Sequence, residues 1–71
     1  MNSTFSWCVI ILAYNEAATL ERVIAKTIPV LESITPRFSI LIVNDGSTDG
    51  TREVSDALVA ADQRVHVIHH D

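Results

Sequence analysis

The chain has 71 residues, of which 48% are hydrophobic, and a formal net charge of -4. So high a hydrophobic fraction excludes a disordered tail, and the length allows one small domain or part of one. The five Lys and Arg residues are scattered, so no basic stripe exists that would bind nucleic acid. The longest apolar run, Trp7 to Ala13, is shorter than the ~20 residues of a membrane span, and the sequence favours a cytoplasmic protein.

The first predicted element is a strand from Phe5 to Ala13. Its centre, Cys8 to Leu12, is continuously apolar rather than alternating, which is typical of a parallel strand covered on both faces. We therefore expect Cys8 to be a buried, small hydrophobic residue.

A helix is predicted to follow, with Asn15 as its N-cap residue and Glu16 in its first turn. Its apolar positions recur at spacings of three and four residues and form one stripe. Pro29 removes one backbone N–H and crowds the carbonyl of Ala25, so we expect a kink or a break into two short helices near Lys26 to Pro29. The stripe consists of Leu20, Val23, Ile24, Thr27, Ile28, Leu31 and Ile34.

The remaining elements are a strand, a polar turn, a helix and a third strand. The strand covers Phe38 to Val43, and the turn Asn44 to Gly50 is made of residues that favour turns. The second helix covers Thr51 to Asp62, and Val65 to His69 is the third strand. The apolar face of the second helix is predicted to consist of Val54, Ala57, Leu58 and Ala61.

This β-α-β-α-β order predicts an α/β fold with a three-layer parallel sheet and right-handed crossovers. Ligands of such sheets bind beyond the carboxyl ends of the strands. Two polar turns are predicted to lie there, one at Tyr14–Glu16 and the other at Asn44–Gly50.

The second turn carries the richer chemistry. Asp45 is the first acid after the strand, and a carboxylate there is able to accept a hydrogen bond from the ring N–H of a nucleotide base. Gly46 permits a positive φ and close approach of a ligand. Tyr14, at the neighbouring strand end, offers a flat face for stacking. The plainer alternative is that this segment is only a turn, with Asp49 capping the second helix.

Two kinds of metal site are alternatives for the polar residues. Asp45, Ser47, Asp49, Gly50 and Asp56 have the spacing of a calcium-binding EF-hand loop, but a strand precedes them where an EF-hand needs a helix. The cluster His66, His69, His70 and Asp71, with His66 and His70 on one face of the strand, makes a zinc site conceivable, but the interpretation that we favour is a strand end that runs into a loop.

The segments Ile11–Glu16 and Val43–Thr51 resemble the two opening signatures of family 2 glycosyltransferases, which have the GT-A fold. In that family a strand ends in Tyr-Asn-Glu, and the next ends in Asp-Asp-Gly-Ser-x-Asp-x-Thr. The resemblance extends from Val9 to His70. It departs at Asn44, where the family often has Asp, and at Leu12, where Pro is common.

The resemblance implies that residues 1–71 are the amino-terminal, nucleotide-binding part of a Rossmann-like GT-A domain that transfers sugar, typically with inversion, from a UDP- or GDP-sugar. In the family, the residue that matches Tyr14 lies against the base of the nucleotide. The residue that matches Asp45 accepts a hydrogen bond from the ring of that base. The implied nucleotide-binding residues are Tyr14, Asn15, Glu16, Asp45, Gly46 and Ser47.

The resemblance also implies groups that this sequence lacks. The Asp-x-Asp that binds Mg²⁺ or Mn²⁺ and the catalytic general base come later in the family, so no metal ligand or catalytic residue is assigned here. We do not expect the chain to be active alone. The residues Ile34–Arg37 lengthen the spacing between the signatures, as in the subgroup with polyprenyl-phosphate acceptors at the cytosolic face of a membrane. The alternative is a catalytically inactive fragment or interaction module that keeps only the α/β motif.

Overall fold

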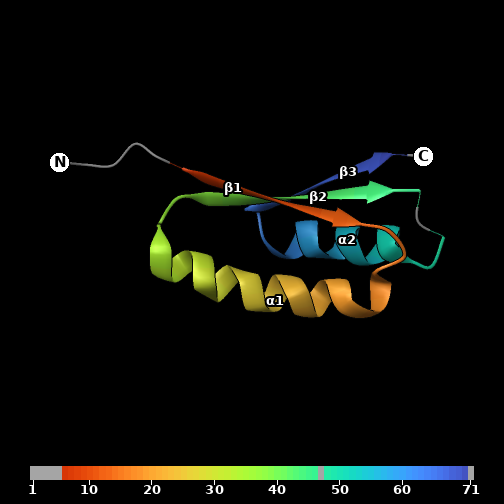
Figure 1. The fold of residues 1–71 in the computed structure, drawn as a ribbon, viewed down its shortest axis with the longest axis horizontal. Coiled ribbons are helices and arrows are strands. Elements are labelled where there is room, and N and C mark those ends of the chain that lie inside the picture. Colours follow the sequence, from red (N-terminus) through yellow and green to blue (C-terminus); the bar gives the residue numbers. More distant parts are fainter. Residues whose placement is uncertain (1–5, 47, 71) are drawn as a thin grey trace.

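A computed structural model describes residues 6–46 and 48–70 and shows a small sheet packed against two helices (Figure 1). The elements in chain order are β1 (Trp7–Ala13), α1 (Ala17–Ile34), β2 (Phe38–Asp45), α2 (Thr51–Ala61) and β3 (Val65–His70).

The three strands are parallel and lie in the order β1-β2-β3, which confirms the predicted β-α-β-α-β fold. Ala13 pairs with Asn44, and Asn44 pairs with His69, so the three strands end at the same edge of the sheet. Both helices lie on one face of this sheet (Figure 1). The described residues therefore form two of the three predicted layers.

The core lies between β2 and α1. Ile40 and Ile42 are fully buried, and Leu20, Ile24 and Leu31 of α1 are nearly so. Burial alternates along β2 because successive side chains of a strand point to opposite faces. The helices thus cover the face that carries Ile40, Ile42 and Asn44.

The opposite face of the sheet is largely exposed and apolar. Ile10, Leu12 and Ile68 are 61%, 78% and 53% exposed. Cys8 lies on the same face of β1 and is also exposed, so the prediction that it is buried is wrong. A continuous apolar run predicts that both faces of a strand are covered, but it does not say which element covers each face. In the described residues, the two helices cover one face only (Figure 1).

Helix α1 continues through Pro29 as one helix, so of the two expected outcomes, a kink or a break into two helices, the break is wrong. Pro29 and Ala25, the two residues between which the proline removes a helical hydrogen bond, are both exposed. Ile24 and Leu31 are buried on either side of the proline and anchor the helix to the sheet. The helix therefore tolerates Pro29 because the lost hydrogen bond lies on its exposed face.

Helix α2 is rotated relative to the predicted apolar face. Thr51 and Ser55 are fully buried, although both are polar. The Ser55 hydroxyl donates to the Thr51 carbonyl at 2.6 Å, so its polar group is satisfied within the helix. Of the predicted apolar face, Val54 and Leu58 pack against the core. Ala57 and Ala61 are exposed.

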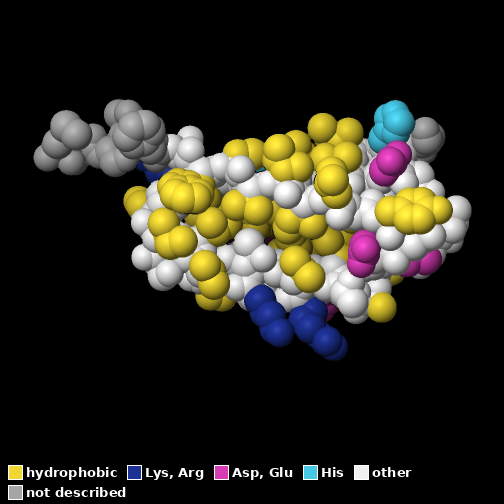
Figure 2. Space-filling view, viewed as in Figure 1, with side chains coloured by type: hydrophobic (Ala, Val, Ile, Leu, Met, Phe, Trp, Pro, Cys, Tyr) yellow, Lys and Arg dark blue, Asp and Glu magenta, His cyan; other side chains and the backbone are white. Residues whose placement is uncertain are grey.

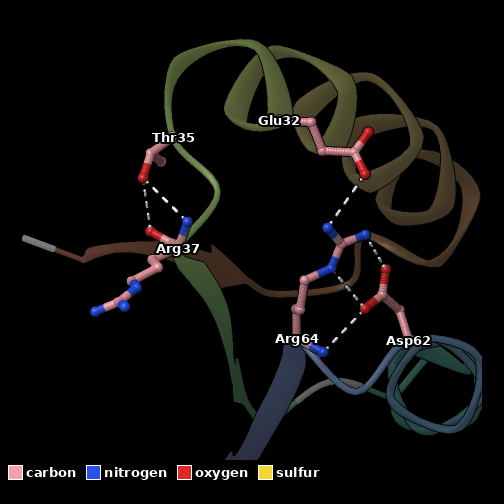
Figure 3. A network of polar contacts seen from close by, with 5 residues as sticks. All are labelled: Glu32, Thr35, Arg37, Asp62 and Arg64. Atoms are coloured by element: carbon pink, nitrogen blue, oxygen red, sulfur yellow. Dashed lines mark hydrogen bonds and ion pairs between the residues drawn. The ribbon is translucent and has the colours of Figure 1, made fainter. Parts of the chain in front are cut away.

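A polar network closes the end of the sheet that lies away from the polar turns (Figure 3). The Arg64 guanidinium donates to Asp62 at 2.8 Å and to Glu32 of α1 at 3.1 Å, and it lies 4.6 Å from the centre of the Phe38 ring. In the neighbouring turn, Thr35 Oγ1 accepts from the Arg37 N–H at 3.0 Å. Arg64 therefore links α1 to the start of β3.

Replacement of Asp62 by Asn should reduce the acid sensitivity of the fold. The Arg64 side chain, and then its backbone N–H, lower the Asp62 pKa from 3.8 to about 2. The contribution of the ionised Asp62 carboxylate to the stability of the folded protein is complete above pH 3.8, and it is lost as the pH falls through about 2. Urea unfolding at several pH values should show the largest deficit of Asp62→Asn at neutral pH, shrinking between about pH 4 and pH 2.

The control is Glu53→Gln, which removes an exposed carboxylate from α2 without touching Arg64. If Asp62→Asn lowered the free energy of unfolding by the same amount at pH 7 and at pH 2, the lowered pKa of Asp62 would not explain its contribution to stability.

Candidate functional site

A cleft of about 420 Å³ lies on the exposed face of the sheet, where the strands end. Figure 2 shows acidic and histidine side chains gathered at this end of the molecule, beside hydrophobic ones. Each strand supplies part of the lining, either from its last residues or from the turn after it. The lining residues are Leu12, Ala13, Tyr14, Glu16, Val43, Asp45 and His70.

Tyr14 and Asp45 lie on neighbouring strand ends, as the order of elements predicts. Tyr14 follows β1 and is 61% exposed. Asp45 is the last residue of β2, and its side chain is 71% exposed. An aromatic side chain and a carboxylate therefore line the same cleft.

His70 is the lining residue whose role the sequence does not reveal. It pairs with Asp45 in the register of β2 and β3, and its Nδ1 lies 2.9 Å from Asp45 Oδ1. From the sequence, His70 is interpreted as part of a strand end, with a zinc site as the alternative. The available signal is the parallel register, which places the end of the third strand beside the end of the second.

The turn after β2 begins at Gly46, whose φ is +65°. Its N–H donates to the carbonyl of His70 at 2.6 Å, which extends the pairing of the two strands by one residue. The left-handed backbone conformation explains why glycine occupies this position. Ser47, the next predicted site residue, lies outside the described residues.

Asn15 does not cap α1, contrary to the prediction. The N-cap position is Glu16, and Asn15 has a φ of +51°. The Asn15 Oδ1 instead accepts from the N–H of Thr48 at 2.8 Å, across 33 residues of sequence. Asn15 therefore joins the turn after β1 to the turn after β2, and the Glu16 side chain lines the cleft.

The buried residue Thr51 makes a second link between the turns. Its hydroxyl accepts from the Glu16 N–H at 2.9 Å and donates to Asp49 Oδ1 at 2.5 Å. Asp49 also accepts from the N–H groups of Thr51 at 3.1 Å and Ala17 at 3.2 Å. These hydrogen bonds, above all the one from the Thr51 hydroxyl, lower the pKa of Asp49.

The two metal alternatives gain no support from this geometry. Within residues 6–46 and 48–70, no group of three His, Cys, Asp or Glu side chains is placed to hold a metal ion. Both oxygens of Asp49 bind N–H or O–H donors, and Asp56 contacts His69 at 2.8 Å. His66 and His70 do share a face of β3, as predicted. We therefore derive no metal-dependent step from the described residues.

The chain belongs to glycosyl transferase family 2, because the model of that family matches residues 8–71. Both segments that resemble this family supply residues to the lining of the cleft: Leu12, Ala13, Tyr14 and Glu16 from the first, and Val43 and Asp45 from the second. Members of the family transfer sugars and commonly use a divalent cation.

Several curated proteins are similar to this chain. It is 40% identical over 65 residues to the glycosyltransferase AglD of Haloferax volcanii, 42% over 62 to the polyprenol monophosphomannose synthase of Mycolicibacterium smegmatis, and 37% over 60 to the undecaprenyl-phosphate mannosyltransferase of Micrococcus luteus. These matches cover 89%, 86% and 84% of this chain but 10%, 22% and 23% of the relatives. Among the described residues, no helix is long and apolar enough to cross a membrane.

Replacement of Thr51 by Val should destabilise the protein by about 1–3 kcal/mol, because the Glu16 N–H loses its acceptor while the shape of the side chain is kept. Chemical denaturation measures this loss. Thr51→Ser keeps the hydroxyl and should lose less. A Thr51→Val variant that is as stable as the wild type would show that the hydroxyl does not join the turns.

Proposed function

We propose that the cleft binds the nucleotide of a UDP- or GDP-sugar, and that the protein transfers the sugar from this donor to an acceptor. The observation that carries the proposal is the placement of Tyr14 and Asp45 on adjacent strand ends of one cleft. Its volume of about 420 Å³ is within the range of small-molecule sites. Membership of glycosyl transferase family 2 supplies the reaction class.

The chemistry of the cleft suits a base that carries a ring N–H. Uracil and guanine each have one, and the Asp45 carboxylate is an acceptor for it. The Tyr14 ring offers an exposed face on which such a base would stack. Gly46, directly after Asp45, has no side chain that would obstruct a ligand, and its φ of +65° is a conformation that other residues rarely adopt.

The other predicted site residues have supporting roles in this proposal. The Glu16 carboxylate lines the cleft and would accept hydrogen bonds from sugar hydroxyls. Asn15 holds the second turn through Thr48. Ser47 follows Gly46 directly, and we keep it as a candidate ligand of the nucleotide. We propose that the donor complex contains Mg²⁺ or Mn²⁺, and no residue of 1–71 is assigned a catalytic or metal-binding role.

A polyprenyl phosphate is the acceptor that we favour. The names of the similar proteins from Mycolicibacterium smegmatis and Micrococcus luteus refer to polyprenol and undecaprenyl phosphate. The length of the segment before β2 also resembles this subgroup. Such an acceptor would place the protein at the cytosolic face of a membrane.

Replacement of Asp45 by Ala should weaken binding of UDP or GDP by roughly ten- to a hundredfold, or about 1.5–3 kcal/mol, the usual value of a charge-assisted hydrogen bond. Isothermal titration calorimetry measures this change. The control Glu53→Ala removes an exposed acid from α2 that does not line the cleft, and it should bind as the wild type does. Equal affinity of Asp45→Ala and the wild type would rule out the site.

Tyr14 provides an independent test of the same cleft. Tyr14→Phe keeps the aromatic face and should bind nucleotide nearly as well as the wild type, whereas Tyr14→Ala should bind about three- to tenfold more weakly. The same titrations report both variants. A wild-type protein that binds neither UDP nor GDP would instead favour an interaction module without chemistry.

A further inference from the structure

The proposed function leaves His70 without a role, although it lines the cleft beside Asp45. The two residues are direct partners in the register of β2 and β3. Their side chains meet on the exposed face, with His70 Nδ1 2.9 Å from Asp45 Oδ1. The contact is therefore part of the surface that a ligand of the cleft would meet.

The direction of this hydrogen bond follows from the chemistry of the two groups. An ionised carboxylate only accepts hydrogen bonds, so the proton lies on His70 Nδ1. Asp45 Oδ1 is thereby engaged. Because the Asp45 side chain is 71% exposed and a carboxylate has about four acceptor positions, the group keeps room for a donor from a ligand.

The backbone holds His70 in place independently of Asp45. Its carbonyl accepts from the Gly46 N–H at 2.6 Å. One residue earlier, His69 lies 3.0 Å from Nδ2 of buried Asn44 and 2.8 Å from Asp56 of α2. These contacts tie the end of β3 to β2 and α2. The imidazole of His70 is therefore presented to Asp45 by a supported strand end.

We propose that His70 is a positioning residue for the donor nucleotide. Its Nδ1–H orients the Asp45 carboxylate so that Oδ2 accepts the ring N–H of the base. The pair would then select uracil or guanine, which carry a ring N–H, against adenine and cytosine, which do not. This inference rests on the proposed function, because it needs Asp45 to contact the base.

The test compares a nucleotide that has the ring N–H with a methylated analogue that lacks it. The probes are UDP and 3-methyl-UDP, or GDP and 1-methyl-GDP if the wild type binds GDP more tightly. For each variant, calorimetry gives the affinity for the unmethylated nucleotide divided by the affinity for its methylated analogue. In His70→Ala, we expect this ratio to fall by about two- to fivefold, the range of an exposed ion pair or hydrogen bond.

Rescue separates positioning from a general effect on the fold. In His70→Asn, the amide nitrogen is as many bonds from the backbone as Nδ1 and also donates, so the ratio should return to the wild-type value. The control His66→Ala removes an exposed histidine from the same face of β3, outside the cleft, and should leave the ratio unchanged. In a background of Asp45→Ala, His70→Ala should have no further effect on the ratio.

The outcomes distinguish this inference from the proposed function. If Asp45→Ala leaves the ratio unchanged, Asp45 does not contact the base and both ideas fail. If Asp45→Ala lowers the ratio but His70→Ala does not, the nucleotide site stands and the role of His70 is wrong. If His70→Ala lowers the ratio and His70→Asn fails to restore it, donation from Nδ1 is not the cause.

Discussion

The buried hydroxyl of Thr51 is the interaction on which the geometry of the cleft most depends. It accepts from the Glu16 N–H and donates to Asp49, so one oxygen atom joins the turn after β1 to the start of α2. Turns at the ends of strands are otherwise free to vary, since few packing contacts hold them. Asn15 adds a second link through the Thr48 N–H. Tyr14 lies in the first of these linked turns, and Asp45 is the last residue of the strand that leads into the second.

The sheet contributes a second constraint, because its parallel register brings three strand ends to one edge. The helices cover only one face, so side chains that point the other way border the cleft. Asp45 and His70 point to that open face, and Asn44 and His69 point inward. A shift of one residue in register would exchange these two pairs, which would bury the acid and remove it from the cleft.

Sequence reasoning succeeds here where the signal is local. The order of the strands along the chain, the polar turns and the positions of Tyr14 and Asp45 follow from which residues adjoin apolar runs. It fails where the partner is distant in sequence. Asn15 has the pattern of a cap for α1, but its partner is Thr48. The role of His70 depends on a register with Asp45 that no local pattern contains. An apolar run also does not identify the element that covers it, so the exposure of Cys8 could not be predicted.

The departure of Asn44 from the family pattern is explained by the same long-range pairing. An amide in place of a carboxylate brings N–H donors into a nearly fully buried site, where each needs an acceptor. His69 Nδ1 lies 3.0 Å from Asn44 Nδ2 and accepts a hydrogen bond from it. The proton of the ring is then on Nε2, which donates a hydrogen bond to Asp56 at 2.8 Å. Asn44 Oδ1 has no partner among the described residues. The hydrogen bond from Asn44 to His69 thus offsets part of the free-energy cost of burying the amide. Asn44 directly precedes Asp45 in β2, and His69 directly precedes His70 in β3. The support beneath the cleft and the selectivity proposed for it therefore depend on the same two strand ends.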